Sequence, residues 1–500
     1  MLETSTLFLL NKMSDEITLR IVKNTYQLNF NAYDMGHDDQ HSACNRRRRG
    51  YFVGVAGTGM SPMALFLAGK GDEVYGSDRA FAQKEKNQDY KELSRHGINC
   101  VMQDGEHLPT DLDFAVVSTA VEDTNPDIKE IKRRNVKIMH RSELLAEIAS
   151  NHCGGAICVG GTAGKSTTTH LIYQLLHGAG KQPCMIAGAA DNNVKRGGEP
   201  GNFDNSGDGP LVFEGDESDK SIVRYNPTMS VITNVGHDHH EIDVTVGLFQ
   251  TVADNTADTV VLNSGDENLR RLNCKKRVTF ALAEKDNNAD FKVTDLKHTS
   301  EGIAFSINEV PFAYHSIGLH NALNIAAAVA MASVYGVNVE ECAKILSKFG
   351  GVYRRGNIIG KNANGSLLVD DFAHTPEEVA ETIRTLASFS DKVYAVYQPH
   401  GFGPLRKTYE QMAILLKEVM RTQDVFYLAD VYYEGGTTDM SIGSKFVADY
   451  FTSQGINCVY VQDRNEIPAM IKKESKANDS IVIMGARDKS LADYACSFKG

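Results

Sequence analysis

Residues 157–169 read Ile157-Cys158-Val159-Gly160-Gly161-Thr162-Ala163-Gly164-Lys165-Ser166-Thr167-Thr168-Thr169, and this stretch decides the fold. An apolar run enters a glycine-rich turn, and the turn ends in Lys-Ser where leucines begin to recur at helical spacing. Backbone N–H groups of such a turn, together with the N-terminal end of a helix, bind phosphate. We expect Lys165 to reach a terminal phosphate and the Ser166 hydroxyl to be a Mg²⁺ ligand. The stretch therefore predicts a P-loop-type α/β domain.

Composition limits the class of protein. A chain of 500 residues predicts three domains at about 150 residues each. A net charge of −12 argues against a nucleic-acid partner. The nine cysteines are scattered, odd in number and without a C-x-x-C pair, which is typical of a reduced, cytoplasmic protein. No run approaches the roughly 18 apolar residues that span a membrane, so we expect no membrane partner.

Residues 1–49 are polar and lack a periodic pattern, so we expect a disordered N-terminal extension. The basic run 46–49 stands just before the first strand. It could contact an anionic surface, or it could be a solvated linker, with Met13 as an alternative start of the chain.

The next segment, 50–150, has the pattern of a Rossmann-like domain. An apolar strand at 51–55 is followed by G-x-x-G-x-G, a helix at 61–68 and a second strand at 73–78 that ends in Asp78. Glycines at this turn let a pyrophosphate approach, and the acid stands at the tip of the second strand. The spacing differs from the usual G-x-G-x-x-G, so an NAD-dependent oxidoreductase stays open for this segment taken alone.

The central domain, 151–348, carries polar clusters after two further apolar strands. Strand 210–213 leads into the acidic run 214–219, and strand 230–235 leads into Gly236-His237-Asp238-His239-His240. Since the carboxyl ends of parallel strands bind ligands, we expect both clusters beside the P-loop, where they could hold a divalent cation. Solvated loops and ordinary polar strand ends are the alternatives, and a zinc hydrolase is a rival for the histidines.

Two asparagines precede the alanine-rich run 325–332, which predicts a helix. Asn321 and Asn324 could recognise a base through their amides, or they could cap the helix. The last domain, 349–500, again alternates strands with helices and predicts a second Rossmann-like domain. In it Thr375 and Pro376 begin a helix, as cap and first residue.

In their order along residues 51–488, these motifs resemble the Mur ligases, ATP-dependent amide-forming enzymes of peptidoglycan synthesis. The matching stretches are G-x-x-G-x-G-M with Ser77-Asp78, G-T-x-G-K-S-T-T, Asp216-Glu217-Ser218-Asp219, Thr233-Asn234 with Asp238-His239, H-N-A-L-N, Arg354-Arg355, Asp370-Asp371-Phe372-Ala373-His374-Thr375-Pro376, and Gln398-Pro399-His400.

The resemblance implies roles for individual residues. The UDP part of the substrate, rather than NAD, would be held by Gly54, Gly57, Gly59, Met60, Ser77 and Asp78. ATP would be bound by Gly161, Thr162, Ala163, Gly164, Lys165, Ser166, Thr167, Asn321, Asn324, Arg354, Asp371 and His374. Lys165, Glu217 and His239 would be catalytic, and Mg²⁺ would be held by Ser166, Glu217 and His239.

The implied reaction joins L-alanine to UDP-N-acetylmuramate through an acyl phosphate. Alanine-adding members read Q-P-H-R-Y-x-R, whereas this chain has Gly401 and Pro404 in place of the two arginines. We expect Arg406, the nearest cation in the sequence, to compensate. A member of the family that adds a whole peptide, and a nucleotide-binding regulator without turnover, stay open. The sequence leaves open the acceptor's identity and the oligomeric state.

Overall fold

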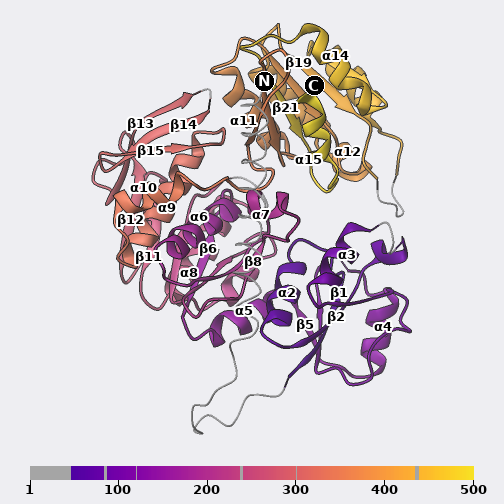
Figure 1. The fold of residues 1–500 in the computed structure, drawn as a ribbon, viewed down its shortest axis with the longest axis vertical. Coiled ribbons are helices and arrows are strands. Elements are labelled where there is room, and N and C mark those ends of the chain that lie inside the picture. Colours follow the sequence, from indigo (N-terminus) through magenta and orange to yellow (C-terminus); the bar gives the residue numbers. More distant parts are fainter. Residues whose placement is uncertain are drawn as a thin grey trace, which may run out of the picture. The chain divides into compact units, whose positions relative to one another are not determined.

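The computed structural model describes residues 47–83, 87–119, 121–236, 240–299, 301–433 and 439–499. Most of the expected N-terminal extension, residues 1–46, lies outside these ranges. Arg48–Gly500 form one compact unit, and its described residues contain three sheets with helices on them (Figure 1), which confirms the α/β class. Among the described helices, none has both the length and the apolar character needed to cross a membrane.

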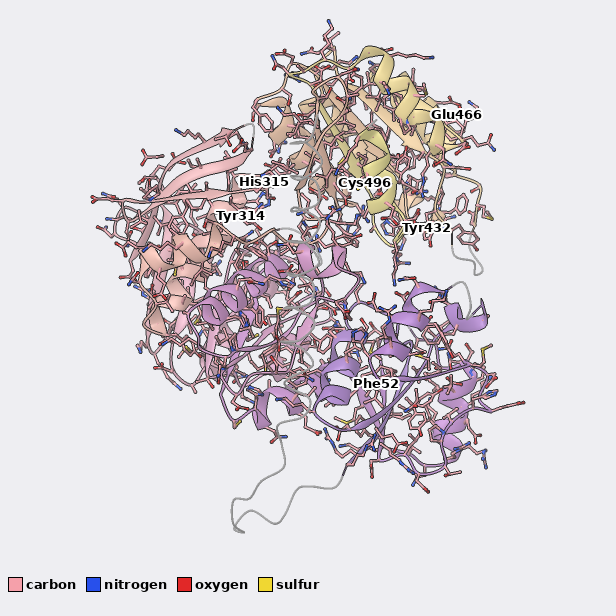
Figure 2. All side chains as sticks on the ribbon, viewed as in Figure 1. Phe52, Tyr314, His315, Tyr432, Glu466 and Cys496 are labelled. Carbon is pink, nitrogen blue, oxygen red and sulfur yellow. The ribbon has the colours of Figure 1, made fainter. Side chains whose placement is uncertain are left out.

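The first sheet is parallel throughout, in the order β3-β2-β1-β4-β5. Phe52 of its central strand is fully buried (Figure 2). Because β1 lies between β2 and β4, the turn after β1 is at the switch point where such sheets bind ligands. The elements are β1 (Arg49–Val53), α2 (Ser61–Gly69), β2 (Glu73–Ser77), η1 (Arg79–Gln83), α3 (Gln88–Arg95), β3 (Asn99–Val101), β4 (Phe114–Val117), α4 (Pro126–Arg133), β5 (Ile138–His140) and α5 (Arg141–Asn151).

The basic run before β1 is partly built into this domain. Arg48 forms ion pairs with Asp72 at 3.0 Å and with Glu147 at 2.6 Å. Arg49 is paired with Glu73 at 2.9 Å. These two arginines are therefore tied to the domain's own carboxylates, and Arg49 is already the first residue of β1.

The second sheet has the order β15-β14-β13-β12-β11-β10-β6-β9-β7-β8. Its central strands are parallel, so the turn after β6 is flanked by the turns after β9 and β10. Its strands are β6 (Ala156–Gly160), β7 (Cys184–Ile186), β8 (Phe203–Asp204), β9 (Leu211–Glu214), β10 (Met229–Ile232), β11 (Val260–Asn263), β12 (Arg277–Leu282), β13 (Phe291–Thr299), β14 (Gly302–Ile307) and β15 (Val310–Tyr314). Its helices are α6 (Lys165–Gly178), α7 (Asn192–Arg196), η2 (Ser221–Arg224), α8 (Ile242–Asn255), η3 (Leu269–Arg271), α9 (His320–Val334) and α10 (Val339–Leu346).

Both ends of this sheet differ from the expected parallel arrangement, since β8 also pairs antiparallel with β7. Strands β13, β14 and β15 pair antiparallel. Asn308 and Glu309 join β14 to β15 with φ of 47° and 71°. Two residues with positive φ make the tight hairpin turn that suits neighbouring twisted strands. This short connection leaves no room for the crossover that a parallel pair needs.

The third sheet has the order β16-β17-β21-β18-β19-β20 and is parallel except for β16 against β17. Helix α11 begins as expected, because Thr375 caps it, Pro376 is its first residue and Glu378 completes a capping box. The elements are β16 (Asn357–Lys361), β17 (Leu367–Asp371), α11 (Pro376–Ala387), β18 (Val393–Tyr397), α12 (Phe402–Val419), β19 (Val425–Ala429), α13 (Ser444–Ser453), β20 (Cys458–Val461), η4 (Arg464–Glu466), α14 (Ile467–Glu474), β21 (Ser480–Met484), α15 (Leu491–Cys496) and η5 (Ser497–Lys499).

Candidate active site

The turn between β6 and α6 is tightly enclosed by its neighbours. Gly161 has φ of 141° and Gly164 has φ of 84°, a region that favours glycine. A Cβ at Gly161 would lie 1.9 Å from Oγ1 of Thr233, and one at Gly164 would lie 2.4 Å from Oδ1 of Asn324. Backbone conformation and crowding together therefore exclude larger residues at both positions.

Lys165 folds back over this turn. Its Nζ donates hydrogen bonds to the carbonyl oxygens of Gly161 at 2.7 Å and Thr162 at 3.1 Å, and it lies 2.9 Å from Oε2 of Glu217. Glu217 is 3% exposed, and burial raises the pKa of its carboxyl even though the Lys165 charge opposes the shift. The structure thus brings two of the three expected catalytic residues into contact.

The end of β10 supports the turn through two residues that had no predicted role. Thr233 Oγ1 and Asn234 Nδ2 both donate to the carbonyl oxygen of Ala163, at 2.8 and 2.9 Å. In return, the N–H of Ala163 donates to Oδ1 of Asn234 at 2.9 Å. His239 follows this strand outside the described residues, so its catalytic and metal-binding roles stay predictions.

Both asparagines of α9 are inside the protein, each 4% exposed. Nδ2 of Asn324 donates to Oδ1 of Asn321 at 3.2 Å, and Nδ2 of Asn321 donates to the carbonyl oxygen of Ile317 at 2.8 Å. The residue before the helix is Leu319, and no side chain caps the helix there. Neither asparagine therefore acts as the helix cap. Because α9 packs against α6, Asn324 reaches the phosphate-binding turn.

The carboxylates of the acidic run after β9 contact two different cationic side chains. Glu217 contacts Lys165, whereas Asp216 and Asp219 accept hydrogen bonds from Arg141, the first residue of α5. Burial alone would raise the pKa of Asp216, but hydrogen bonds from Ser218 and Arg141 bring it below its ordinary value. Arg141 was not among the predicted site residues, because no local pattern links it to a run 75 positions later.

Residues expected to bind UDP lie around the turn after β1. Asp78 accepts hydrogen bonds from the N–H groups of Ala56 at 3.1 Å and Ala80 at 3.0 Å, so its carboxylate shapes this turn. Ser77 is fully buried and donates to Asp127 at 2.5 Å. Further expected residues in this turn are Gly54 with φ of 79°, and Gly57, Gly59 and Met60, which lead into α2.

The expected ATP residues of the third domain form a separate cluster. Nε of Arg354 is 3.0 Å from Oδ1 of Asp370, and Nη2 donates to the carbonyl oxygens of Asp371 at 3.1 Å and Gly485 at 2.9 Å. Burial raises the pKa of Asp371 to about 6. Nδ1 of His374 lies 3.1 Å from a Glu378 oxygen. Their binding of ATP stays a prediction.

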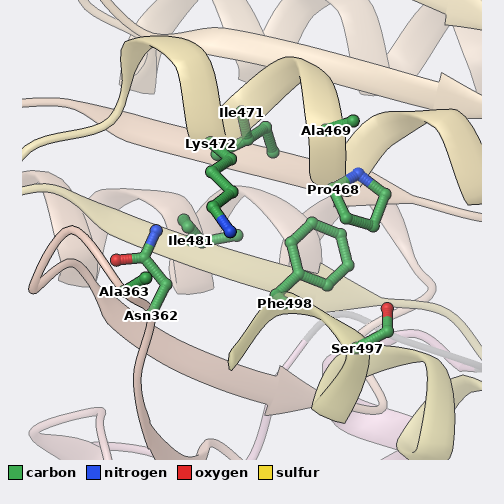
Figure 3. A pocket seen from close by; sticks show the side chains of 9 residues that line it. All are labelled: Asn362, Ala363, Pro468, Ala469, Ile471, Lys472, Ile481, Ser497 and Phe498. Carbon is green, nitrogen blue, oxygen red and sulfur yellow. The ribbon is translucent and has the colours of Figure 1, made fainter. Parts of the chain in front are cut away.

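The third domain also has a cavity of about 210 Å³, whose lining side chains are shown in Figure 3. Asn362 of its lining precedes β17, and Ile481 is the second residue of β21. The cavity is therefore at the amino-terminal ends of these strands, opposite the edge where parallel sheets bind ligands. Its lining is completed by Ala363, Pro468, Ala469, Ile471, Lys472, Ser497 and Phe498.

Three family models match the chain in order. Residues 50–152 match the Mur ligase family catalytic domain, residues 159–332 match the Mur ligase middle domain, and residues 354–487 match the Mur ligase glutamate ligase domain. Together they cover most of the chain.

Individual relatives point the same way. UDP-N-acetylmuramate–L-alanine ligases of Rubrobacter xylanophilus and Caldicellulosiruptor bescii are 31% and 32% identical over 458 residues each, covering 88% of this chain and 98% and 96% of theirs. A crystal structure of UDP-N-acetylmuramate–alanine ligase from Thermotoga maritima has a TM-score of 0.71 at 25% identity, over 90% of this chain and 98% of that one. A murein peptide ligase from Psychrobacter arcticus shares the fold, with a TM-score of 0.63 at 22% identity over 91% and 99% of the two chains. On this evidence, the chain belongs to the Mur ligase family.

Proposed function

We propose that this chain is an ATP-dependent ligase that joins L-alanine to UDP-N-acetylmuramate. The observation that carries the proposal is the phosphate-binding turn, with Lys165 over buried Glu217, in a chain that aligns with alanine-adding ligases over 88% of its length. A dehydrogenase leaves this turn unexplained, and so does a zinc hydrolase.

The chemistry needs the carboxylate of UDP-N-acetylmuramate to become a better acylating agent. One carboxylate oxygen attacks the γ-phosphorus of ATP, ADP leaves, and an acyl phosphate forms. The neutral amine of alanine then attacks the carbonyl carbon, the C–O bond to phosphate breaks, and the amine proton is released. Lys165 is placed to neutralise charge on the transferring phosphoryl group, which is the main requirement of such a transfer.

The residues around Lys165 suit a magnesium ion. If Lys165 moves to a phosphate, the carboxylate of Glu217 is left buried without its cation, a costly state that a bound cation relieves. Glu217 and Ser166, the second residue of α6, offer the oxygen ligands that Mg²⁺ prefers. When bound, Mg²⁺ would add to the neutralisation of phosphate charge. We propose these two residues as its ligands, with His239 as a third.

The other expected contacts complete the proposal. The turn after β1, with Gly54 and Asp78, would hold the UDP part. Asn324 would contact the adenine from α9, since its amide already reaches the phosphate-binding turn. Asp371 and His374 would approach ATP from the third domain.

A second candidate is a ligase that adds a peptide, and the backbone at Gly401 is the observation that keeps it open. Gly401 has φ of 112° and ψ of 146°, a conformation that arginine adopts only under strain. The arginine that alanine-adding sequences have at this position would be strained in this backbone, so this chain needs another residue to hold the amine substrate.

Phosphate release separates the candidates. Wild-type protein with ATP and UDP-N-acetylmuramate is assayed with L-alanine, D-alanine, glycine, L-serine and a muramyl-type tripeptide. We expect release that requires UDP-N-acetylmuramate and is fastest with L-alanine. With ¹⁸O in the carboxylate, one labelled oxygen should appear in the released phosphate, because the acyl phosphate passes it on. Release that ignores every amine, or that leaves the label in the amide product only, would overturn the proposal.

A further inference from the structure

Three neighbouring loops at the carboxyl edge of the third sheet each carry a histidine or an arginine. Asp371 of β17, Met484 of β21 and Tyr397 of β18 lie in one row, because Met484 is the register partner of both others. His374, Arg487 and His400 each follow their strand's member of this row by three residues. Arg487 is thus on the middle loop, between the loops that carry the two histidines.

The backbone at Arg487 is held in a conformation that arginine rarely adopts. Its φ is 62°, in the left-handed region. Both neighbours are fixed, since Ala486 and Asp488 are 3% and 5% exposed and the N–H of Asp488 donates to the carbonyl oxygen of Ala486 at 2.7 Å. Arg487 itself is exposed. Strain of this kind is kept where the surrounding structure enforces it, and it is concentrated at functional sites.

Three other arginines near this edge already have carboxylate partners, and Arg355 lies over the ring of Phe372 at 4.9 Å. Arg354 is paired with Asp370, and Arg464 lies 2.5 Å from Asp488 and also donates to Gln398. Arg406, expected to replace the missing arginines, forms an ion pair with Asp439 instead. Within the described part of the chain, Arg487 has no hydrogen bond, ion pair or ring contact, so its guanidinium is available to a ligand.

The surroundings favour an anion. Burial and the nearby His374 and Arg487 lower the pKa of His400 to about 4, so its imidazole is neutral near pH 7. Nδ1 of His400 is buried and has no hydrogen-bond partner among the described residues. The charge of His374 is matched by Glu378, whereas Arg487 has no carboxylate partner among the described residues.

The proposed reaction supplies such an anion. The amine of the incoming substrate is consumed, but its carboxylate is unchanged and needs a partner that leaves the amine free. We infer that Arg487 binds this carboxylate, and that the cation which alanine-adding relatives carry at the positions of Gly401 and Pro404 is here supplied by the loop after β21. This inference rests on the proposed function.

Kinetics with a substrate that lacks the carboxylate test the inference. Arg487→Gln, Arg487→Gly and Arg487→Lys are compared with wild type, using L-alanine and L-alaninamide. We expect Arg487→Gln to raise KM for alanine by about tenfold or more, the equivalent of about 1.4 kcal/mol, while KM for alaninamide, ATP and UDP-N-acetylmuramate stays as in wild type. Arg487→Lys should keep part of the preference for alanine over alaninamide.

Arg487→Gly distinguishes the effect of losing the charge from an effect on folding. Glycine relieves the left-handed backbone, so this variant should unfold at or above the wild-type temperature and still lose the preference for alanine. Arg384→Gln, an exposed arginine of α11, is the control and should leave every KM unchanged.

The outcomes separate the two proposals. Wild-type release that does not respond to alanine but responds to a peptide overturns the alanine assignment, and the comparison is then made with that peptide and its C-terminal amide. If the wild type turns over and the ratio of KM values for acid and amide is the same in Arg487→Gln, the inference is wrong. An equal rise of KM for acid and amide, or a rise confined to ATP, also overturns it. If no amine at all stimulates release, both proposals fail.

Discussion

The ammonium group of Lys165 lies 2.9 Å from a carboxylate oxygen of Glu217, and the two side chains are 20% and 4% exposed. A lysine in a phosphate-binding turn is expected to be exposed and free of packing, so that its removal affects activity alone. Here Lys165 also holds the charge of a buried carboxylate, which ties the stability of the domain to the same residue.

Lys165→Ala should therefore abolish phosphate release and also lower the free energy of unfolding by about 1–3 kcal/mol, since Glu217 is left buried without its cation. Adding Glu217→Gln should recover most of the stability but none of the activity. Urea unfolding and phosphate release of the single and double variants measure the two effects. Equal stability of Lys165→Ala and wild type would show that Glu217 does not depend on this contact.

Gly164→Ala, just before α6, should disturb the phosphate-binding turn more than a matched change just after the other end of this helix. A Cβ at Gly164 meets Oδ1 of Asn324 at 2.4 Å, whereas a Cβ at Gly180, just after the helix, meets nothing within 4 Å. Both residues have positive φ, 84° and 71°, so both variants lose about 1 kcal/mol to backbone strain.

Only Gly164→Ala displaces Asn324, so only this variant should also raise KM for ATP. Thermal unfolding and ATP kinetics of the two variants provide the comparison. Equal kinetics in both would contradict a role of the contact between the turn and α9.

Local patterns predicted the parts of the fold that depend on neighbouring residues. The strand, turn and helix around Lys165 and the cap of α11 at Thr375 were correct because each is fixed by residues within a few positions. The hairpin at Asn308 and Glu309 was missed, because neither residue is the glycine that usually marks such a turn.

Contacts between distant segments could not be read from the sequence. Arg141 meets Asp216 because α5 packs against the central domain, and no spacing in the sequence encodes that approach. Likewise, proximity in the sequence to Gly401 and Pro404 favoured Arg406, and nothing in the sequence pointed to Arg487. Only the fold shows that Arg406 is paired with Asp439 and that Arg487 follows the strand between those that lead to His374 and His400.

Stability should depend on pH through His374 and Glu378. Burial alone would lower the pKa of His374, but the hydrogen bond and charge of Glu378 raise it. Burial would raise the pKa of Glu378, but His374 lowers it to about 2. The pair thus stabilises the fold fully below the ordinary histidine pKa of about 6.5. This stabilisation is lost as pH rises through the raised pKa of His374. The stabilisation is also lost at low pH, as the pH falls from the ordinary glutamate pKa of about 4.3 to the lowered pKa of Glu378, about 2.

Glu378→Gln keeps the capping box, because glutamine can accept the same N–H bonds, and removes only the charge. The difference from wild type in free energy of unfolding should be about 0.5–1 kcal/mol between roughly pH 4.5 and 6.5 and should shrink above pH 7. Glu381→Gln on the same helix loses a pair with Arg384, which stays charged, so its difference should be flat from pH 5 to 9. A flat profile for Glu378→Gln as well would contradict the pairing.

Arg354 should act first as an internal clamp of the third domain. Its side chain is 5% exposed against 0% for Asp370, and its hydrogen bonds to the carbonyl oxygens of Asp371 and Gly485 join the ends of β17 and β21. Burial raises the pKa of Asp370 although Arg354 opposes the shift, so removing the arginine leaves this carboxyl without its counter-charge. Arg354→Ala should therefore lower the free energy of unfolding by about 3–5 kcal/mol.

Arg355→Ala is the matched control, because this neighbour is only partly buried and lies over the ring of Phe372 at 4.9 Å. Losing a cation–π contact of that kind costs about 0.5–1 kcal/mol. Replacing both members of the buried pair, as Arg354→Met with Asp370→Asn, should recover part of the stability that Arg354→Ala loses, since no unpaired charge is left buried. A direct contact with ATP predicts something different: KM for ATP would rise in Arg354→Met with Asp370→Asn, measured well below its unfolding temperature. Unfolding curves and ATP kinetics of these variants, taken at one temperature, decide between a clamp alone and a clamp that also binds the nucleotide.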